Sequence, residues 1–209
     1  MLTMMPMAAC DGSNADPILP EQPGQPGNSD GGDEDDSTDP TNPIPGGNGR
    51  YLVLYCSRTG STERMAQQIQ QTLDCDILEV EPQTPYESDY NGMLNRAQEE
   101  LAAIRQGNYP AIKTSVEDFG NYDIVFVGYP IWYGSMGTPM QTFLHNHASK
   151  LAGKRIALFA SSGSSGISAS VDEARTLCSG ATFTETLLLT SSTLSQMGNR
   201  IRTWLETLG

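Results

Sequence analysis

From Arg50 onward, the sequence alternates continuous apolar runs of strand length with longer amphipathic stretches. Such alternation is typical of βαβ units, in which helices join parallel strands and cover the sheet. Strands that are buried on both faces show no polar alternation, and residues 51–55 and 123–129 have this uninterrupted apolar character. The pattern therefore predicts an α/β fold built on one parallel sheet.

The apolar runs predict five strands, and the amphipathic stretches predict four or five helices. Strands are expected at residues 51–55, 76–80, 123–129, 156–160 and 181–189. Helices are expected at residues 62–73, 91–106, 139–148, 168–177 and 197–208. The connection at residues 81–115 is longer than a crossover requires, and its Tyr86 and Tyr90 are expected to pack locally rather than to border a ligand.

Residues 57–62 lie where the first predicted strand gives way to the first predicted helix. The first N–H groups of such a helix have no partner within it, and the aligned peptide dipoles leave about half a positive charge there. Four hydroxyl side chains in this stretch can bind phosphate oxygens, and Gly60 permits a close approach or a positive φ. Taken alone, however, the stretch is more readily interpreted as a helix cap than as an anion site.

Two more loops follow predicted strands. Residues 130–134 place adjacent aromatic side chains after the third strand, and residues 161–166, made only of Ser and Gly, follow the fourth. Adjacent aromatic rings more often fill a core, but open α/β sheets bind ligands outside the carboxyl ends of their strands, where these loops and residues 57–62 would meet. A ligand that suits all three has a phosphate, a flat polarisable ring and a polar ring edge. Flavin mononucleotide (FMN) has that shape.

On these three motifs, residues 50–209 resemble a flavodoxin, and most closely the flavodoxin-type proteins with a helix inserted after the second strand. The resemblance implies a doubly wound sheet of five parallel strands in the order 2-1-3-4-5, with helices on both faces and FMN as cofactor. It implies that the FMN phosphate is bound by Ser57, Arg58, Thr59, Gly60, Ser61 and Thr62. It implies that the isoalloxazine is lined by Pro130, Ile131, Trp132, Tyr133 and Gly134, with Trp132 or Tyr133 against its face. It implies that the pyrimidine edge is bound through the backbone of Ser161, Ser162, Gly163, Ser164, Ser165 and Gly166.

The sequence departs from the family pattern at three places. Ser61 stands where relatives often have Asn, so a side-chain amide is replaced by a hydroxyl. Relatives usually have consecutive glycines where Gly163-Ser164 stands, so a positive φ at Ser164 would be strained. Gly137 stands where relatives tend to have Pro, which is expected to loosen the start of the following helix. Backbone groups can supply what these changes remove, so FMN binding is still expected.

The resemblance implies electron transfer through bound FMN, either to a redox partner protein or to a small quinone-like acceptor. It also suggests that the peptide near Gly134 turns its carbonyl toward the flavin N5–H on reduction. The first alternative is an FMN-dependent NAD(P)H:quinone-type oxidoreductase, for which residues 82–107 could build a substrate wall. The second alternative is a protein-interaction module with an empty flavin pocket. No catalytic side chain is assigned.

The first 49 residues differ in amino-acid composition from the rest. Residues 1–9 are uncharged and end in small side chains before Cys10, which resembles the lipid-accepting cysteine of a bacterial lipoprotein signal, although a basic start and a full apolar core are missing. Residues 11–49 are rich in Pro, Gly and Asp, as expected for a disordered tether. We therefore expect a protein anchored to the membrane of the cell envelope through a lipid on Cys10, or otherwise a cytoplasmic protein with a disordered tail.

Charge and cysteine spacing argue against a nucleic-acid-binding protein and against a metalloprotein. The formal net charge of −13 divides into −9 on residues 1–49 and −4 on residues 50–209, which leaves no basic footprint for nucleic acid. The four cysteines have no metal-ligand spacing, so no metal is predicted, and Cys56 and Cys75 are expected to be packing thiols. His145 and His147 are expected to serve at a helix end or on the surface.

Overall fold

The structure is a computed structural model that describes residues 50–208. The predictions for Cys10 and for the tether at residues 11–49 lie outside the described residues. No helix within residues 50–208 combines the length and the apolar character needed to cross a membrane.

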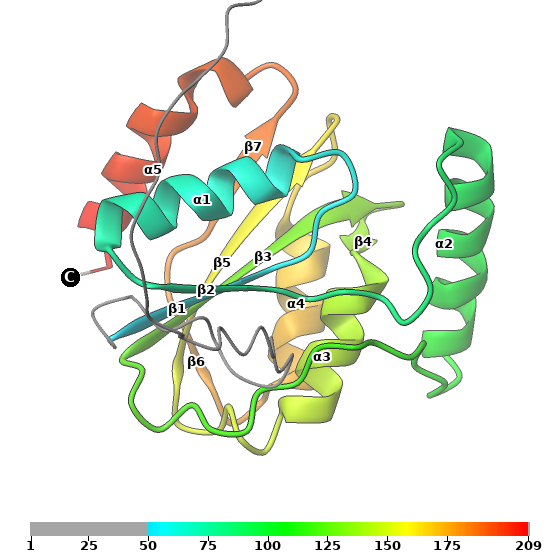
Figure 1. The fold of residues 1–209 in the computed structure, drawn as a ribbon, viewed down its shortest axis with the longest axis horizontal. Coiled ribbons are helices and arrows are strands. Elements are labelled where there is room, and N and C mark those ends of the chain that lie inside the picture. Colours follow the sequence, from blue (N-terminus) through cyan, green and yellow to red (C-terminus); the bar gives the residue numbers. More distant parts are fainter. Residues whose placement is uncertain (1–49, 209) are drawn as a thin grey trace, which may run out of the picture. The chain divides into compact units, whose positions relative to one another are not determined.

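The structure is an α/β fold with a central parallel sheet covered on both faces, as predicted (Figure 1). Its strands are β1 (Tyr51–Tyr55), β2 (Asp76–Glu79), β3 (Ile124–Trp132), β4 (Ser135–Met136), β5 (Arg155–Ser162), β6 (Thr182–Phe183) and β7 (Leu187–Thr190). Its helices are α1 (Ser61–Leu73), α2 (Tyr90–Ile104), α3 (Thr138–His147), α4 (Ser168–Leu177) and α5 (Met197–Glu206), with a 3-10 turn η1 (Leu194–Gln196) before α5.

The sheet has seven strands and not the predicted five in the order 2-1-3-4-5. The main path runs β2-β1-β3-β5-β6, with β4 antiparallel to β3 and β7 parallel to β5. One extra strand arises because the chain folds back after Trp132, so that Pro130–Trp132, expected as a loop, extend β3. The other arises because the predicted last strand divides into β6 and β7, where the Trp204 indole N–H of α5 donates to the Glu185 carbonyl at 2.8 Å.

Two hydrophobic clusters hold the helices to the sheet. Odd and even residues of a strand point to opposite faces, so Val53 packs with α1 and α5 while Leu52 and Leu54 pack with α3 and α4. Figure 1 shows this pairing of α1 with α5 on one side and α3 with α4 on the other. Both clusters are closed to solvent, and this rigid sheet fixes where the strand ends lie.

Helix α2, which follows β2 in the chain, stands apart from these layers (Figure 1). Its Met93 and Ala97 form a separate small cluster with Trp132 of β3. The Arg96 guanidinium donates to the carbonyls of Thr84 and Pro85, which fastens α2 to the loop before it. The helix is therefore held beside the carboxyl end of the sheet rather than on either face.

The structure also tests the predictions for two cysteines and for the two histidines. Cys56 and Cys75 are buried free thiols, as expected, and burial raises the pKa of each to about 12. His147 does end α3, but it is buried and not on the surface. His145 is exposed and stacks on the Tyr109 ring at 3.8 Å.

Candidate functional site

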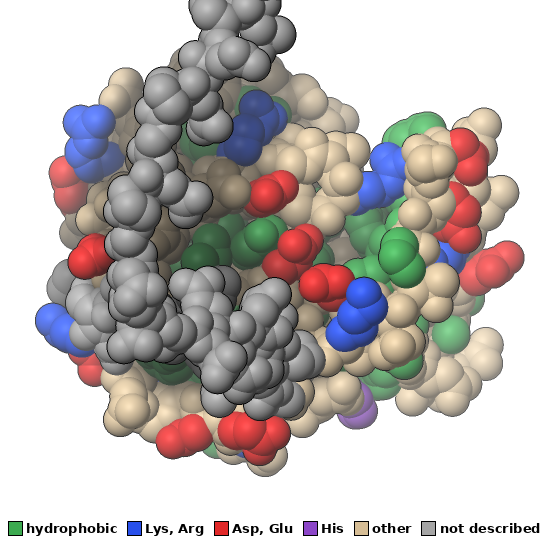
Figure 2. Space-filling model, viewed as in Figure 1, with side chains coloured by type: hydrophobic (Ala, Val, Ile, Leu, Met, Phe, Trp, Pro, Cys, Tyr) green, Lys and Arg blue, Asp and Glu red, His purple; other side chains and the backbone are tan. Residues whose placement is uncertain are grey.

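A cleft of about 430 Å³ lies at the carboxyl ends of β1, β3 and β5, within the usual range for small-molecule sites. All predicted site residues line it except the three glycines Gly60, Gly134 and Gly166. The three loops therefore meet as expected, since the parallel strands that carry them are neighbours. Figure 2 shows hydrophobic side chains gathered in the hollow between α2 and the rest of the domain.

The loop from β1 to α1 presents a helix N-terminus to the cleft. Gly60 occupies the N-cap position with φ 79°, and no side chain caps α1. The Ser57 hydroxyl instead accepts from the Gly60 N–H at 3.1 Å, which shapes the loop before the helix begins. The first N–H groups of α1 thus keep their capacity for an anion, so the structure favours the anion site over the simple helix cap.

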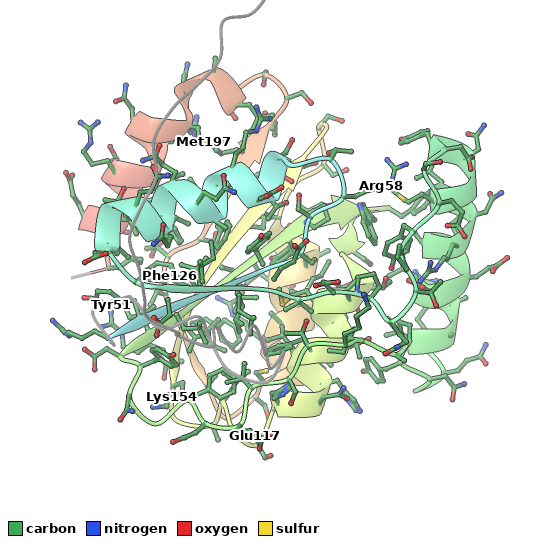
Figure 3. The ribbon with its side chains drawn as sticks, viewed as in Figure 1. Tyr51, Arg58, Glu117, Phe126, Lys154 and Met197 are labelled. Atoms are coloured by element: carbon green, nitrogen blue, oxygen red, sulfur yellow. The ribbon has the colours of Figure 1, made fainter. Side chains whose placement is uncertain are left out.

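Within residues 50–208, Arg58 is the only charged side chain that lines the cleft. Its guanidinium donates to the carbonyls of Glu87, Ser88 and Asp89, at 3.3, 3.0 and 3.2 Å. Figure 3 shows the side chain between the loop after β1 and α2. Its observed contacts therefore tie the predicted phosphate loop to the residue that caps α2.

The aromatic loop is a tight hairpin. Trp132 pairs with Ser135 across it, and the two connecting residues Tyr133 and Gly134 have φ of 51° and 80°. The Trp132 ring is buried against the edge of Tyr86, with ring centroids 5.1 Å apart. The Tyr133 ring is 51% exposed at the cleft. The hairpin therefore offers one fixed ring and one accessible ring.

Side chains from α3 and α4 hold the base of this hairpin. Both carboxylate oxygens of Glu173 accept hydrogen bonds, from the Ser135 hydroxyl at 2.7 Å and from the Met136 N–H at 2.9 Å. The Gln141 amide donates to the Met136 carbonyl at 2.7 Å. Gly137, expected to loosen the start of α3, donates its N–H to the Pro130 carbonyl at 2.9 Å, a bond that proline could not make. This hydrogen bond opposes the expected loosening.

The third loop joins the first through a buried hydrogen bond. The hydroxyls of Thr62 and Ser161 lie 2.8 Å apart and are both closed to solvent. Among the described residues with positive φ, neither Gly163 nor Ser164 appears, so the strain expected from the missing second glycine does not arise. The Ser and Gly backbone of this loop lines the cleft without distortion.

Five lining residues were not predicted. Tyr90, Met93 and Leu94 come from α2, and Ser191 and Leu194 follow β7. Tyr90 was expected to pack locally, yet it is 65% exposed at the cleft. The signal for α2 was the length of the connection at residues 81–115, whereas nothing in the sequence marked Ser191 or Leu194.

A polar network fixes α2 behind Trp132. Glu100 accepts from the hydroxyls of Tyr86 and Thr138 at 2.5 Å each, and from Arg96 at 2.8 Å. Burial, reinforced by the carboxylate of Glu100, raises the pKa of Tyr86 well above its usual range. Tyr86 therefore stays a neutral hydrogen-bond donor and, contrary to Tyr90, packs locally as expected.

The cleft provides many groups that can bind a ligand. Among the residues that the structure describes, its lining holds hydroxyls, backbone groups, aromatic rings and Arg58, without a carboxylate, histidine or thiol. No group of metal-binding side chains occurs within residues 50–208. The Cys56 thiol is buried outside this lining with its pKa raised. The arrangement suits a bound molecule with an anionic end and a flat ring.

Comparisons with known proteins match this geometry. A family model described as flavodoxin matches residues 50–208. A flavoprotein of known structure from Bacteroides eggerthii is 33% identical with a TM-score of 0.63, over 75% of this chain and 96% of that one. Another, from Bacteroides uniformis, is 28% identical with a TM-score of 0.62, over 75% of this chain and 99% of that one. A Lactobacillus acidophilus flavoprotein solved in complex with FMN is 25% identical with a TM-score of 0.57, over 71% of this chain and 97% of that one. A search of curated proteins finds no match.

Proposed function

The chain belongs to the flavodoxin family and binds FMN, and from this premise we propose that it transfers electrons through the bound flavin. One observation carries the proposal: the cleft joins an uncapped helix N-terminus, which suits a phosphate, to an aromatic hairpin, which suits a flat ring. FMN supplies reversible acceptance of electrons, and the protein supplies binding, orientation and electrostatics.

Each part of the cleft has a role in this proposal. The N-terminus of α1 and the hydroxyls of residues 57–62 hold the phosphate. An anion there accepts hydrogen bonds from unpaired N–H groups and is stabilised by the helix dipole. Trp132 and Tyr133 hold the ring, and the backbone of residues 161–166 binds its polar edge. Arg58 fixes the loop geometry through the three carbonyls before α2.

A specific observation also supports a second candidate, an FMN-dependent NAD(P)H:quinone-type reductase. Tyr90, Met93 and Leu94 of α2 form an apolar wall on the cleft that holds Tyr133. Such a wall could seat a flat acceptor beside the ring. Steady oxidation of NAD(P)H by the purified protein with a quinone present would favour this reductase over a carrier. The interaction module with an empty pocket has no observation in its favour.

Gly60 provides the direct test of the FMN site. A side chain at its φ of 79° costs about 1–2 kcal/mol, although a Cβ there would meet nothing closer than 3.8 Å. We expect Gly60→Ala to lower both stability and FMN affinity, because the loop relaxes away from the anion-binding shape. Gly153→Ala is the matched control, since Gly153 has φ 77° and open space outside the cleft.

The measurements are the flavin absorbance of the purified protein and its thermal unfolding with and without FMN. Gly153→Ala should lose stability but keep the full FMN-induced rise in melting temperature. An equal FMN-induced rise in Gly60→Ala would contradict the assigned phosphate site. A colourless protein that FMN does not stabilise would refute flavin-dependent electron transfer.

We also propose that Cys10 carries a lipid and that residues 11–49 tether the domain to the membrane of the cell envelope, with a redox partner protein or a quinone-like molecule as acceptor. The small residues before Cys10 and the Pro/Gly-rich composition after it support this. Detergent partitioning of the Cys10→Ala variant tests it. Unchanged partitioning would contradict the lipid anchor.

A further inference from the structure

The hairpin that carries Tyr133 has a turn type that can be assigned from its backbone. Two residues connect the paired Trp132 and Ser135, and both have positive φ, 51° at Tyr133 and 80° at Gly134. A two-residue connection with positive φ at both central positions is a type I′ turn. Here the first central position holds tyrosine and only the second holds glycine.

This order of residues restricts how the turn can change. Rotating the peptide between the two central residues converts a type I′ turn into type II′, with the first central residue near φ +60° and ψ −120°. That region strongly favours glycine, because a Cβ there clashes with the backbone. The Cβ of Tyr133 therefore opposes this rotation, whereas Gly134 would permit it.

The two peptides that follow Ser135 are held from outside the hairpin. Glu173 accepts from the Ser135 hydroxyl and from the Met136 N–H, and Gln141 donates to the Met136 carbonyl. The Gly137 N–H closes the base by donating to Pro130. A rotation of the Ser135–Met136 peptide would break the hydrogen bond from its Met136 N–H to Glu173, and a rotation of the Met136–Gly137 peptide would break the bond from Gln141 to the Met136 carbonyl.

We propose that this hairpin keeps one conformation in both oxidation states of the bound FMN, with Tyr133 and Glu173 as positioning residues: the Cβ of Tyr133 excludes the rotated turn, and Glu173 fixes the peptide after it. The inference rests on the proposed function only for its redox part. It replaces the expectation that the peptide near Gly134 turns its carbonyl toward the flavin on reduction. The turn then presents the same groups to the oxidised and to the reduced flavin.

The test compares Tyr133→Ala with Tyr133→Gly in the FMN-loaded protein. Alanine removes the ring but keeps the Cβ, and glycine removes both, so their difference isolates the backbone restriction from any stacking. The amide protons of residues 133 and 134 lie close in a type I′ turn and apart in type II′. Their nuclear Overhauser effect in isotope-labelled protein, oxidised and dithionite-reduced, reports the turn type directly.

We expect a strong effect in both oxidation states for wild type and Tyr133→Ala, and loss of the effect on reduction in Tyr133→Gly. The flavin potential of Tyr133→Gly should then lie above that of Tyr133→Ala, because the released carbonyl stabilises the reduced ring. Loss of the effect in reduced wild type would overturn the proposal, as would a glycine variant that behaves like the alanine variant. The Glu173→Gln variant should show faster amide exchange at Met136, and unchanged exchange would remove Glu173 from the proposal.

Failure of the proposed function would look different. Flavin absorbance that is absent, or that the reductant does not bleach, would refute electron transfer through FMN. In that case, the turn type of the flavin-free protein and its response to Tyr133→Gly still decide whether Tyr133 restricts the hairpin.

Discussion

His147 should make the free energy of unfolding fall as the pH drops below about 6.5. The Val116 N–H lies 3.2 Å from Nε2, and because an N–H can only donate, the ring proton sits on Nδ1, 2.9 Å from the Phe143 carbonyl. The neutral ring is thus satisfied on both nitrogens, with the Ser115 hydroxyl also 3.2 Å from Nε2. A second proton on Nε2 would face the N–H of Val116.

The magnitude follows from proton linkage. Burial lowers the pKa of His147, and Lys150 lowers it further, while the Phe143 carbonyl and Glu117 act in the opposite direction. In the unfolded chain the pKa is about 6.5, so below that pH the unfolded state binds more protons than the native state. Stability is therefore complete above about pH 6.5 and decreases as the pH falls toward the lowered native pKa. The contribution of His147 to the slope of unfolding free energy against pH has an upper limit of about 1.4 kcal/mol per pH unit.

Urea unfolding between pH 5.5 and 8 tests this for wild type and His147→Gln. The variant should be less stable at pH 8, because it loses the hydrogen bonds of the His147 ring. The difference in unfolding free energy between wild type and variant should become smaller as the pH falls. The control is His145→Gln on the same helix, which leaves the His147 ring and its hydrogen bonds in place and should still lose stability at low pH. Parallel curves for wild type and His147→Gln would refute the linkage argument.

Two further predictions concern the packing of the sheet. Gly128→Ala should lower the free energy of unfolding by about 1–3 kcal/mol, because its Cβ would lie 2.1 Å from the buried Phe159 ring. The control Gly198→Ala in α5 would place a Cβ with nothing within 4 Å and should raise the free energy of unfolding by up to about 1 kcal/mol. Equal effects of the two variants in denaturant unfolding would contradict the steric argument. Trp204→Phe should cost about 1 kcal/mol or more, because the Glu185 carbonyl loses its indole donor, and an unchanged melting temperature would show that this hydrogen bond contributes little.

The sheet and the three loops could be predicted because local patterns specify them. The apolar run at 51–55 and the stripe of Met65, Ala66 and Ile69 each follow the period of one element, and α4 begins and ends at the predicted residues. Once parallel strands are placed side by side, their carboxyl ends must meet at one edge. The cleft therefore follows from topology and needs no knowledge of individual contacts.

The remaining features depend on contacts between residues distant in the sequence. At the break between β6 and β7, the Glu185 carbonyl accepts from the Trp204 indole, 19 residues away in the sequence. The place of Arg58 depends on carbonyls about 30 residues away, and the burial of His147 depends on Val116. Tyr90 was misjudged because periodicity places a side chain on a helix face but does not say where the helix docks.

The way α2 is attached has a consequence for how relatives of this protein can diverge. Its fastening depends on a few side chains, chiefly Arg58, Arg96 and Glu100, which bind carbonyls and hydroxyls of neighbouring segments. Backbone carbonyls are present whatever the side chains are, so the inner face with Met93 and the outer surface can vary while the anchors remain. Selection could therefore change the wall of the cleft, and with it the molecules that fit beside a bound ligand, without disturbing the sheet on which the whole domain depends.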